Sequence, residues 1–183
     1  DDGEILVSGE NVMNGYWNDP KATSSTLING WIHTGDIGEF DEEGYLKIID
    51  RKKDIIVNSG GDNISPSRVE EKLNIEPEIA QSMMYGDFKN YLVAILVPDR
   101  DYTQEWAKDH HKEFNIKNLN QDSDFIKMIK TTIERVNKKL SQIEQVRKFL
   151  LIDEEFTVEN NMMTPTLKVR RFKVKEKYQN QLE

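Results

Sequence analysis

Short hydrophobic runs separated by turn residues characterise the first fifty residues. The run Glu4–Gly9 (EILVSG) predicts a strand ended by glycine, and Tyr45–Ile49 (YLKII) predicts another strand after the acidic turn DEEG. Asn-Gly and Asp-Pro pairs in residues 11–23 predict turns between them. This part of the chain is therefore predicted to be β structure.

The pattern after residue 54 predicts strands alternating with helices. IIVN predicts a short strand, and NSGGDNISPSRVEEKL predicts a glycine loop before a helix that has Ser65 as N-cap and Pro66 at its first position. QSMMYGD and YLVAILVP predict two strands joined through Asp87–Asn90. The second of these is almost entirely apolar, which is typical of the central strand of a sheet.

Helical spacing dominates the remaining residues. DYTQEWAKDHHKEF predicts a helix from Asp101, VRKFLLID a strand, residues 154–171 a loop rich in Asn, Thr and Pro, and FKVKEKYQNQLE a last helix. Six apolar residues recur at steps of three and four and predict an amphipathic helix of about five turns: Phe125, Ile129, Ile133, Val136, Leu140 and Ile143.

These elements predict an α+β fold in two parts. Residues 1–52 are predicted to be β-rich, and residues 53–183 to form a small domain with a short central sheet flanked by helices. The boundary falls in the run Asp-Arg-Lys-Lys that ends at Lys53. Because the chain has no initial Met and enters a strand almost at once, we expect it to be a piece of a longer protein.

Composition excludes several classes of function. A net charge of −8 argues against binding nucleic acid or anionic membrane by bulk electrostatics. The absence of cysteine excludes disulfides and thiolate metal sites. No apolar run approaches the ~20 residues that cross a bilayer, and the first residues lack the profile of a signal peptide. We therefore expect a cytoplasmic protein, with any membrane association peripheral.

Common catalytic motifs are missing from the sequence. His33, His110 and His111 form no H-x-x-x-H pair, so no metal site is predicted, and the adjacent His110 and His111 are predicted to lie on a solvated helix face. Neither a hydrolase elbow nor a Walker loop is present. The acidic pairs at residues 42–43 and 154–155 are predicted to lie in turns and to serve solubility.

Four stretches, in this order, carry a resemblance to a known family: GEILVSGENVMNGYWNDPKAT, WIHTGDIGEFDEEGYLKIIDRKKDIIV, NSGGDNISPSRVEEKL and MTPTLKVRRFKV. On them the chain resembles, over almost its whole length, the C-terminal portion of the AMP-forming acyl-CoA synthetases, within the adenylate-forming superfamily. The Thr-Pro-Thr-Leu-Lys form is most similar to the long-chain fatty acid branch, whereas many relatives have Ser-Gly-Lys there.

The resemblance implies a two-step enzyme. A fatty acid and ATP give acyl-AMP, and coenzyme A then displaces AMP to form acyl-CoA. Residues 1–52 would be the β-rich end of the N-terminal adenylation domain, and residues 53–183 the C-terminal lid domain. The rest of the N-terminal domain, needed in cis, would contain the phosphate loop and the fatty-acid pocket. It would also be the main part of the protein that binds Mg²⁺. The chain alone is therefore expected to be inactive.

The resemblance assigns three residues to the nucleotide. Asp36 would accept hydrogen bonds from the ribose hydroxyls, because a carboxylate can accept from both. Arg51 would also reach the nucleotide through its fixed donors. Ile48 would pack near the nucleoside. The structural alternatives are a turn-capping Asp36, a surface ion pair of Arg51 with Asp50 or Asp54, and ordinary strand core for Ile48.

The remaining assignments concern domain rotation and the second step. Lys53 would be the hinge, with a charged linker as the alternative. Gly60 and Gly61 would line the passage for coenzyme A, and a tight turn before the helix is their alternative. Asp62 departs from the family, in which many relatives carry a basic residue, and this puts a phosphate contact by this residue in doubt.

Lys168 would be the catalytic lysine of adenylation, stabilising the charge that builds up between the carboxylate and the α-phosphate. It lies in a basic run with Arg170, Arg171, Lys173, Lys175 and Lys177. The alternatives are a solvated face or an anionic-lipid site. The preceding NNMMTPT is expected to be a mobile loop.

Two classes of alternative function stay open. One is another adenylate-forming enzyme, which hands its acyl group to a carrier protein or an aryl acid to coenzyme A. The other is a non-catalytic module that binds a nucleotide or a partner.

Overall fold

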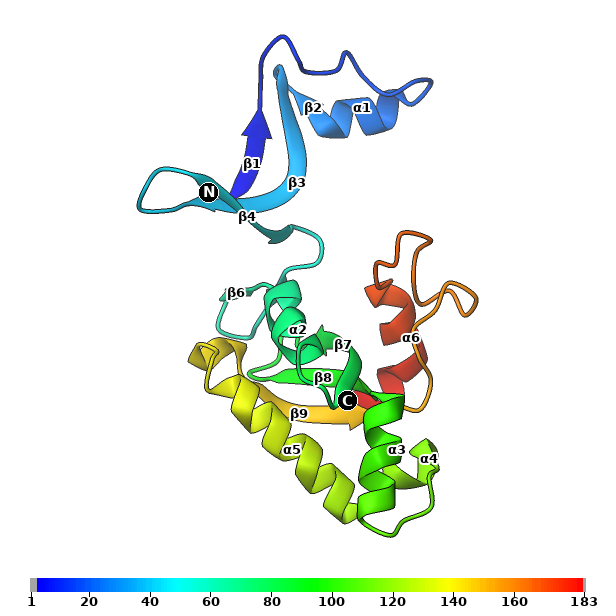
Figure 1. The fold of residues 1–183 in the computed structure, drawn as a ribbon. Coiled ribbons are helices and arrows are strands. Elements are labelled where there is room, and N and C mark those ends of the chain that lie inside the picture. The colour runs from blue at the N-terminus through cyan, green and yellow to red at the C-terminus, as the bar shows by residue number, and fades with distance from the viewer. Residues whose placement is uncertain (1–2, 183) are drawn as a thin grey trace. The chain divides into compact units, whose positions relative to one another are not determined.

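The computed structural model describes residues 3–182, whose elements are labelled in Figure 1. The chain forms two compact units, of which the first ends at Ile55 and the second begins at Ile56. The sequence places the corresponding boundary three residues earlier, after Lys52.

The first unit is a small antiparallel sheet. Its longest strand is β3 (Trp31–Phe40), which pairs with β1 (Glu4–Val7), β2 (Leu27–Ile28) and β4 (Leu46–Arg51). The strands predicted near residues 4–9 and 45–49 are thereby confirmed as β1 and β4.

The turn predicted at the Asp-Pro pair is present but leads directly into a helix. The N–H of Asp19 donates to the carbonyl of Tyr16 at 3.4 Å, and Pro20 begins helix α1 (Pro20–Thr26). Asp19 is the N-cap, and its side chain accepts a hydrogen bond from the N–H of Ala22 at 2.8 Å. Pro20 occupies the first helical position, where its missing N–H has no helical partner to lose. The same dipeptide that interrupts a strand is thus also a good helix start.

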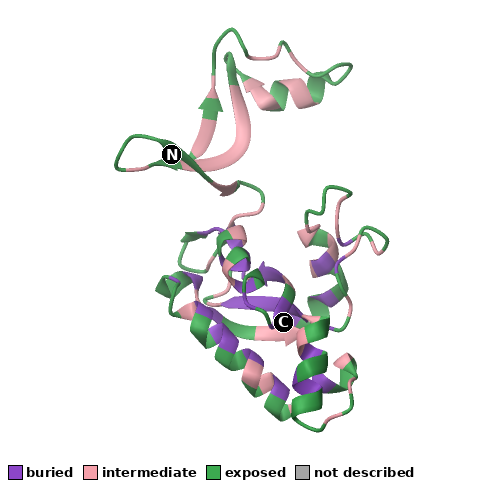
Figure 2. Cartoon of the chain, viewed as in Figure 1, coloured by how far each residue is buried: buried purple, intermediate pink, exposed green. Residues whose placement is uncertain are grey.

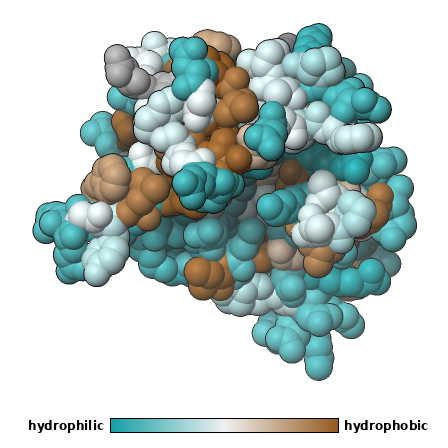
Figure 3. Space-filling view, turned by 90° about the horizontal axis from the view of Figure 1, so that it is seen from above, coloured by the Kyte–Doolittle hydropathy of each residue, from teal (hydrophilic) through white to brown (hydrophobic). Residues whose placement is uncertain are grey.

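The first unit has no buried residue among residues 3–55. Figure 2 shows this contrast, since the buried (purple) segments belong to the second unit. Many large apolar side chains of the first unit are exposed, and the brown areas of Figure 3 show hydrophobic side chains that reach the surface. These exposed residues are Leu6, Tyr16, Trp17, Ile28, Trp31, Phe40, Tyr45, Leu46 and Ile48. The described part of this unit therefore lacks a core of its own.

The second unit is built on a three-stranded sheet in the order β7-β8-β9. β7 (Ile79–Tyr85) is antiparallel to β8 (Leu92–Pro98), and β9 (Val146–Leu151) is parallel to it. Every residue of β8 is buried, which confirms the prediction of a central strand. β5 (Ile56–Val57) and β6 (Asn63–Ile64) form a separate short pair.

Helices cover both faces of this sheet (Figure 1). α2 (Pro66–Asn74), α3 (Arg100–Asp109), α4 (Ile116–Leu119) and α5 (Ser123–Asn137) contribute to one core, and α6 (Arg171–Leu182) to the other. Because side chains alternate across a strand, β8 supplies both cores: Leu92, Ala94 and Leu96 face the first, and Val93, Ile95 and Val97 face the second.

The predicted starts and ends of the helices are partly confirmed. Ser65 is the N-cap of α2 and accepts from the N–H of Arg68 at 3.3 Å, with Pro66 at the first position, as predicted. The last helix is confirmed as α6. No helix among residues 3–182 is both long and apolar enough to cross a membrane.

The predicted five-turn helix is too long, since α5 ends at Asn137. The side-chain amide of Asn137 exchanges two hydrogen bonds with the backbone of Val146, each 2.9 Å, and so ties the end of the helix to the start of β9. Leu140 and Ile143 therefore follow the helix, and Gln142–Glu144 form a short 3-10 helix.

The helix predicted from Asp101 is also shorter than expected. α3 ends at Asp109, and His111 adopts a left-handed φ of +53° that ends helical geometry. The imidazole of His110 stacks on the indole of Trp106 with 4.0 Å between ring centroids. Both histidines are exposed, as predicted, but they follow the last residue of α3 instead of lying on a helix face.

Two isoleucines offer a matched test of the first core of the second unit. Ile129→Ala removes a fully buried side chain from α5 and should lower the free energy of unfolding by about 2 to 5 kcal/mol, through lost burial and the cavity left behind. Ile75→Ala, at a side chain that is 78% exposed, should change it by less than about 0.5 kcal/mol. Urea unfolding followed by circular dichroism measures both, and equal effects would contradict this assignment of the core.

Candidate functional site

The pairing of β3 with β4 brings Asp36 opposite Arg51, 15 residues further along the chain. Nη1 of Arg51 donates to Oδ1 of Asp36 at 2.8 Å and to the carbonyl oxygen of Thr34 at 3.1 Å. This guanidinium forms an ion pair with Asp36. Asp36 lies within β3, so the alternative of a turn-capping Asp36 was wrong.

The Thr-Gly-Asp motif is fixed by its own hydrogen bonds. Gly35 has a φ of +71°, which an L-residue with a side chain rarely adopts. The hydroxyl of Thr34 donates to the carbonyl oxygen of Ile5 at 2.8 Å and accepts from the N–H of Asp36 at 3.1 Å. These contacts hold the strand that carries Asp36 against β1.

Glu4 is a positioning residue that the sequence analysis missed. Its carboxylate, 10% exposed, accepts from the N–H of Gly35 at 3.0 Å, from Nζ of Lys52 at 3.0 Å, and pairs with Nδ1 of His33 at 3.2 Å. The hydrogen bond from Lys52, followed by that from His33, lowers the pKa of Glu4 below its ordinary value of 4.5. The available signal was its place in the Gly-Glu pair that opens the first motif.

A hollow of about 360 Å³ lies beside the Asp36–Arg51 pair. Its lining residues are Gly35, Arg51, Lys52 and Lys53. Arg51 and Lys52 are paired with Asp36 and Glu4, which offset part of the positive charge at the hollow. Lys53 is exposed and lies in a turn in which the N–H groups of residues 54 and 55 bond to the carbonyl of Arg51. Ile48 is 68% exposed in this unit, which has no buried residue among residues 3–55.

The glycine loop, residues 58–62, is closed by a side chain. Oδ1 of Asn58 accepts from the N–H groups of Gly60 and Asp62, each at 2.9 Å, and its Nδ2 donates to Oδ2 of Asp62 at 2.9 Å. Gly61 has a φ of +85°, whereas Gly60 does not need glycine for its φ. The predicted tight turn before α2 is confirmed, and Asp62 closes the loop, which accounts for an acidic residue at this position.

Lys168 lies on a hydrogen-bonded hairpin, here called the lysine hairpin (residues 163–169). Met163 pairs with Val169, the N–H of Thr164 donates to the carbonyl of Lys168 at 2.8 Å, and the N–H of Lys168 donates to the hydroxyl of Thr164 at 3.1 Å. Lys168 is exposed, and the described residues offer its ammonium group no ion-pair partner. The segment is thus a hydrogen-bonded turn that presents an exposed cation.

Most of the basic run pairs with carboxylates of the second unit, which argues against a lipid site, while its lysines at residues 173, 175 and 177 stay 42–46% exposed, as a solvated face would. Four of its members pair with carboxylates: Arg171 with Glu70, Lys173 with Glu176, Lys175 with Asp87 and Lys177 with Glu154. Glu154 therefore does more than serve solubility. It accepts from Lys177 and, at 3.3 Å, from the hydroxyl of Tyr178, whose pKa burial raises to about 12.

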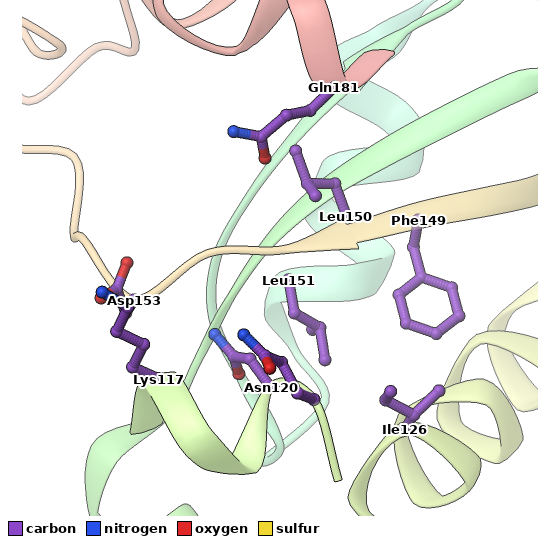
Figure 4. Close-up of a pocket in the computed structure, with 9 residues that line it drawn as sticks. Lys117, Asn120, Ile126, Phe149, Leu150, Leu151, Asp153 and Gln181 are labelled. Atoms are coloured by element: carbon purple, nitrogen blue, oxygen red, sulfur yellow. The ribbon is translucent and has the colours of Figure 1, made fainter. Parts of the chain in front are cut away.

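A cavity in the second unit contains none of the predicted site residues. It measures about 550 Å³ and lies between β9, α4 and the end of α6, as Figure 4 shows. Oδ1 of Asn120 is buried there without a hydrogen-bond partner among the described residues. The lining of this cavity mixes polar and apolar side chains and includes one basic residue, Lys117, so it does not resemble a phosphate site. Within residues 3–182, no three His, Asp or Glu side chains are grouped to hold a metal ion.

The predicted residues thus form two groups. Asp36, Ile48, Arg51 and Lys53 belong to the first unit. The second unit carries the glycine loop and Lys168.

Residues 53–183 match the family described as the AMP-binding enzyme C-terminal domain. The chain belongs to this family of AMP-binding enzymes, which confirms the resemblance found in the four motifs. It is 37% identical over 185 residues to the long-chain-fatty-acid–CoA ligase FadD15 of Mycobacterium tuberculosis, and 38% identical over 186 residues to the human long-chain-fatty-acid–CoA ligase 6. Both alignments include the whole chain but only 31% and 27% of those proteins. The chain thus spans less than a third of either relative.

A solved structure supports the same relationship. The adenylation domain of a carboxylate reductase from Mycobacterium chelonae matches with a TM-score of 0.83 and 26% identity, covering 98% of this chain and 27% of that one. The mixed α/β fold therefore corresponds to part of an adenylation domain.

The titration of Glu4 tests the hydrogen bonds around the Thr-Gly-Asp motif. Because its pKa is lowered in the folded state, its contribution to stability is complete above 4.5 and is lost as the pH falls through the folded pKa. Carboxyl ¹³C NMR should place its midpoint below 4.5. Lys52→Met should raise that midpoint, while Lys47→Met, which alters a contact with Asp41, should not. An unshifted midpoint in Lys52→Met would refute the assignment.

Proposed function

We propose that the chain is part of an AMP-forming fatty acid–CoA ligase, which activates a long-chain fatty acid as acyl-AMP and then forms acyl-CoA. The observation that carries the proposal is the contact of Asp36 with Arg51 beside a hollow lined by three cations. Membership of the AMP-binding enzymes and identities of 37% and 38% to two long-chain-fatty-acid–CoA ligases support it.

The first unit would bind the nucleotide. Arg51 occupies Oδ1 of Asp36, and Oδ2 has no hydrogen-bond donor among the described residues, so Oδ2 can accept from a ribose hydroxyl. The cations of Arg51, Lys52 and Lys53 suit phosphate oxygens. Ile48, exposed on β4, supplies an apolar contact for the nucleoside.

The second unit would supply the lysine of adenylation. As the fatty acid carboxylate attacks the α-phosphorus of ATP, pyrophosphate leaves and negative charge accumulates, which the ammonium group of Lys168 would stabilise. The unit would then rotate about Lys53 and bring the glycine loop, with Gly60 and Gly61, to the passage for coenzyme A. The thiol would attack the acyl-AMP carbonyl and release AMP. Mg²⁺ would be held by the preceding part of the protein.

Burial supports the proposed division into domains. Residues 1–52 would be the end of a larger N-terminal adenylation domain, because none of residues 3–55 is buried and their apolar side chains need a partner. Residues 53–183 would be the lid domain, since their sheet has a core on each face.

A carrier protein is the alternative acceptor that the resemblance leaves open. Comparing coenzyme A with a phosphopantetheinylated carrier protein as acceptor separates the two, and the curated relatives favour coenzyme A.

Lys168→Ala in the full-length enzyme tests the catalytic assignment. Loss of one electrostatic contact to the transition state should slow acyl-AMP formation by about a hundredfold or more. Thioester formation from supplied acyl-AMP should remain, and Lys173→Ala, which removes a lysine already paired on α6, should leave both steps intact. Normal adenylation by the Lys168 variant would exclude its catalytic role and leave Lys168 a structural one.

The isolated chain tests the division of labour. Residues 1–183 alone should give no ATP–pyrophosphate exchange with any fatty acid, because the phosphate loop and the acyl pocket would lie elsewhere in the protein. The full-length enzyme, assayed in parallel, provides the positive control. Exchange by the isolated chain above the buffer rate would refute the proposal that it is one part of the catalyst.

A further inference from the structure

We propose that Glu70, Arg171 and Gln81 form a clamp that positions the lysine hairpin on β7, so that Lys168 moves with the second unit as one body. This inference rests on the proposed role of Lys168 in adenylation. The three are positioning residues and act through the hairpin.

The outgoing end of the hairpin is held by an ion pair. Arg171, which begins α6 three residues after Lys168, donates from both terminal nitrogens to the carboxylate of Glu70, with Nη2 at 2.6 Å from Oε2. Glu70 lies on α2, and the residue as a whole, backbone included, is 8% exposed. Its Oε1 also accepts from the N–H of Met84 in β7 at 2.6 Å. One carboxylate thus ties the junction of hairpin and α6 to α2 and to the sheet.

The incoming end is held by an amide on the same strand. Oε1 of Gln81 accepts from the N–H of Phe156 at 2.6 Å, and its Nε2 donates to the carbonyl of Phe156 at 3.0 Å. The same Nε2 lies 3.9 Å from the sulfur of Met163, the first residue of the hairpin. β7 therefore holds the segment both before and after the hairpin.

Packing closes the base of the hairpin while its tip stays exposed. Met162 is 2% exposed, and the N–H of Arg170 donates to its carbonyl at 2.8 Å. Phe156 and Val174 lie in the same core. Leu167, beside Lys168, is 71% exposed. Because the base of the hairpin is fixed and its tip is exposed, the orientation of the whole second unit sets the position of the Lys168 ammonium group.

The fixed position of the lysine hairpin is expected to matter for adenylation and not for thioester formation. A misplacement of a catalytic group by 1 Å costs on the order of a hundredfold in rate, and Lys168 is proposed to act in adenylation alone. Weakening the clamp should therefore affect adenylation and spare thioester formation, whereas general destabilisation of the unit would affect both.

The test uses Glu70→Gln in the full-length enzyme, since glutamine keeps an acceptor for the N–H of Met84 but cannot form the ion pair. We expect the adenylation rate constant to fall by about ten- to a hundredfold and thioester formation from supplied acyl-AMP to stay within about twofold. Arg171→Lys, which keeps the charge but not the two-pronged contact, should lose less than Arg171→Met.

Glu76→Gln is the matched control. It breaks the pair with Arg135 in the same unit, where the Glu76 side chain is 8% exposed against 11% for Glu70. The melting temperature of the Glu76→Gln variant should fall by about as much as that of the Glu70→Gln variant, while its adenylation rate stays normal.

Each outcome decides one of the two proposals. Normal adenylation by Glu70→Gln, or equal losses in both steps, would overturn the clamp while leaving the role of Lys168 standing. If Lys168→Ala itself adenylates normally, the proposed function fails instead. Should Glu70→Gln not fold, the order of activity of Arg171→Lys and Arg171→Met decides, and equal activity of the two would overturn the clamp.

Discussion

The register between β3 and β4 is the constraint on which the first unit depends. It sets Asp36 opposite Arg51, then shifts by one residue between Ile37 and Gly38. A side chain at Gly38 would meet the Ile5 side chain at 2.8 Å and the Lys47 carbonyl at 3.0 Å. Only glycine permits this close approach, and the shift lets Asp36 and Arg51 meet on one face while the rest of the ribbon stays paired. In a strand, a slip by one residue would send each side chain to the opposite face.

The second unit uses its carboxylates to hold cations in place. Glu70 and Glu154 each take a basic residue of the C-terminal run and connect α6 to earlier parts of the chain. Removing one partner of a well-buried pair such as Glu70–Arg171 leaves an uncompensated charge, which costs more than the pair itself contributes. The acidic composition of the chain is therefore compatible with local cationic sites, because the acids lie where they fix some cations and away from Lys168.

Local signals predicted the elements, whereas distant contacts decided their ends and the site geometry. The apolar run of β8 and the Ser65–Pro66 start of α2 are encoded within a few residues, and both were predicted. The end of α5 depends on Asn137 meeting Val146, which no periodicity reveals. The resemblance singled out Asp36 and Arg51 by type, but their contact follows from strand register. Glu70 and Arg171 lie 101 residues apart, so the sequence alone gave no reason to join them.

The hydrogen bonds around Lys52 bear on the proposed hinge. The backbone N–H of Lys52 donates to the carbonyl of Gly35 at 2.8 Å, and its ammonium group is held by Glu4, 48 residues earlier. The chain is thus anchored to the first unit up to this residue. Lys53 comes next, and no hydrogen bond from the described residues reaches its backbone or side chain. A change of φ and ψ at Lys53 would disturb the two turn bonds to the carbonyl of Arg51, made by the N–H groups of Asp54 and Ile55. Rotation there is therefore less costly than one residue earlier, where it would pull on Glu4 and on the Thr-Gly-Asp motif.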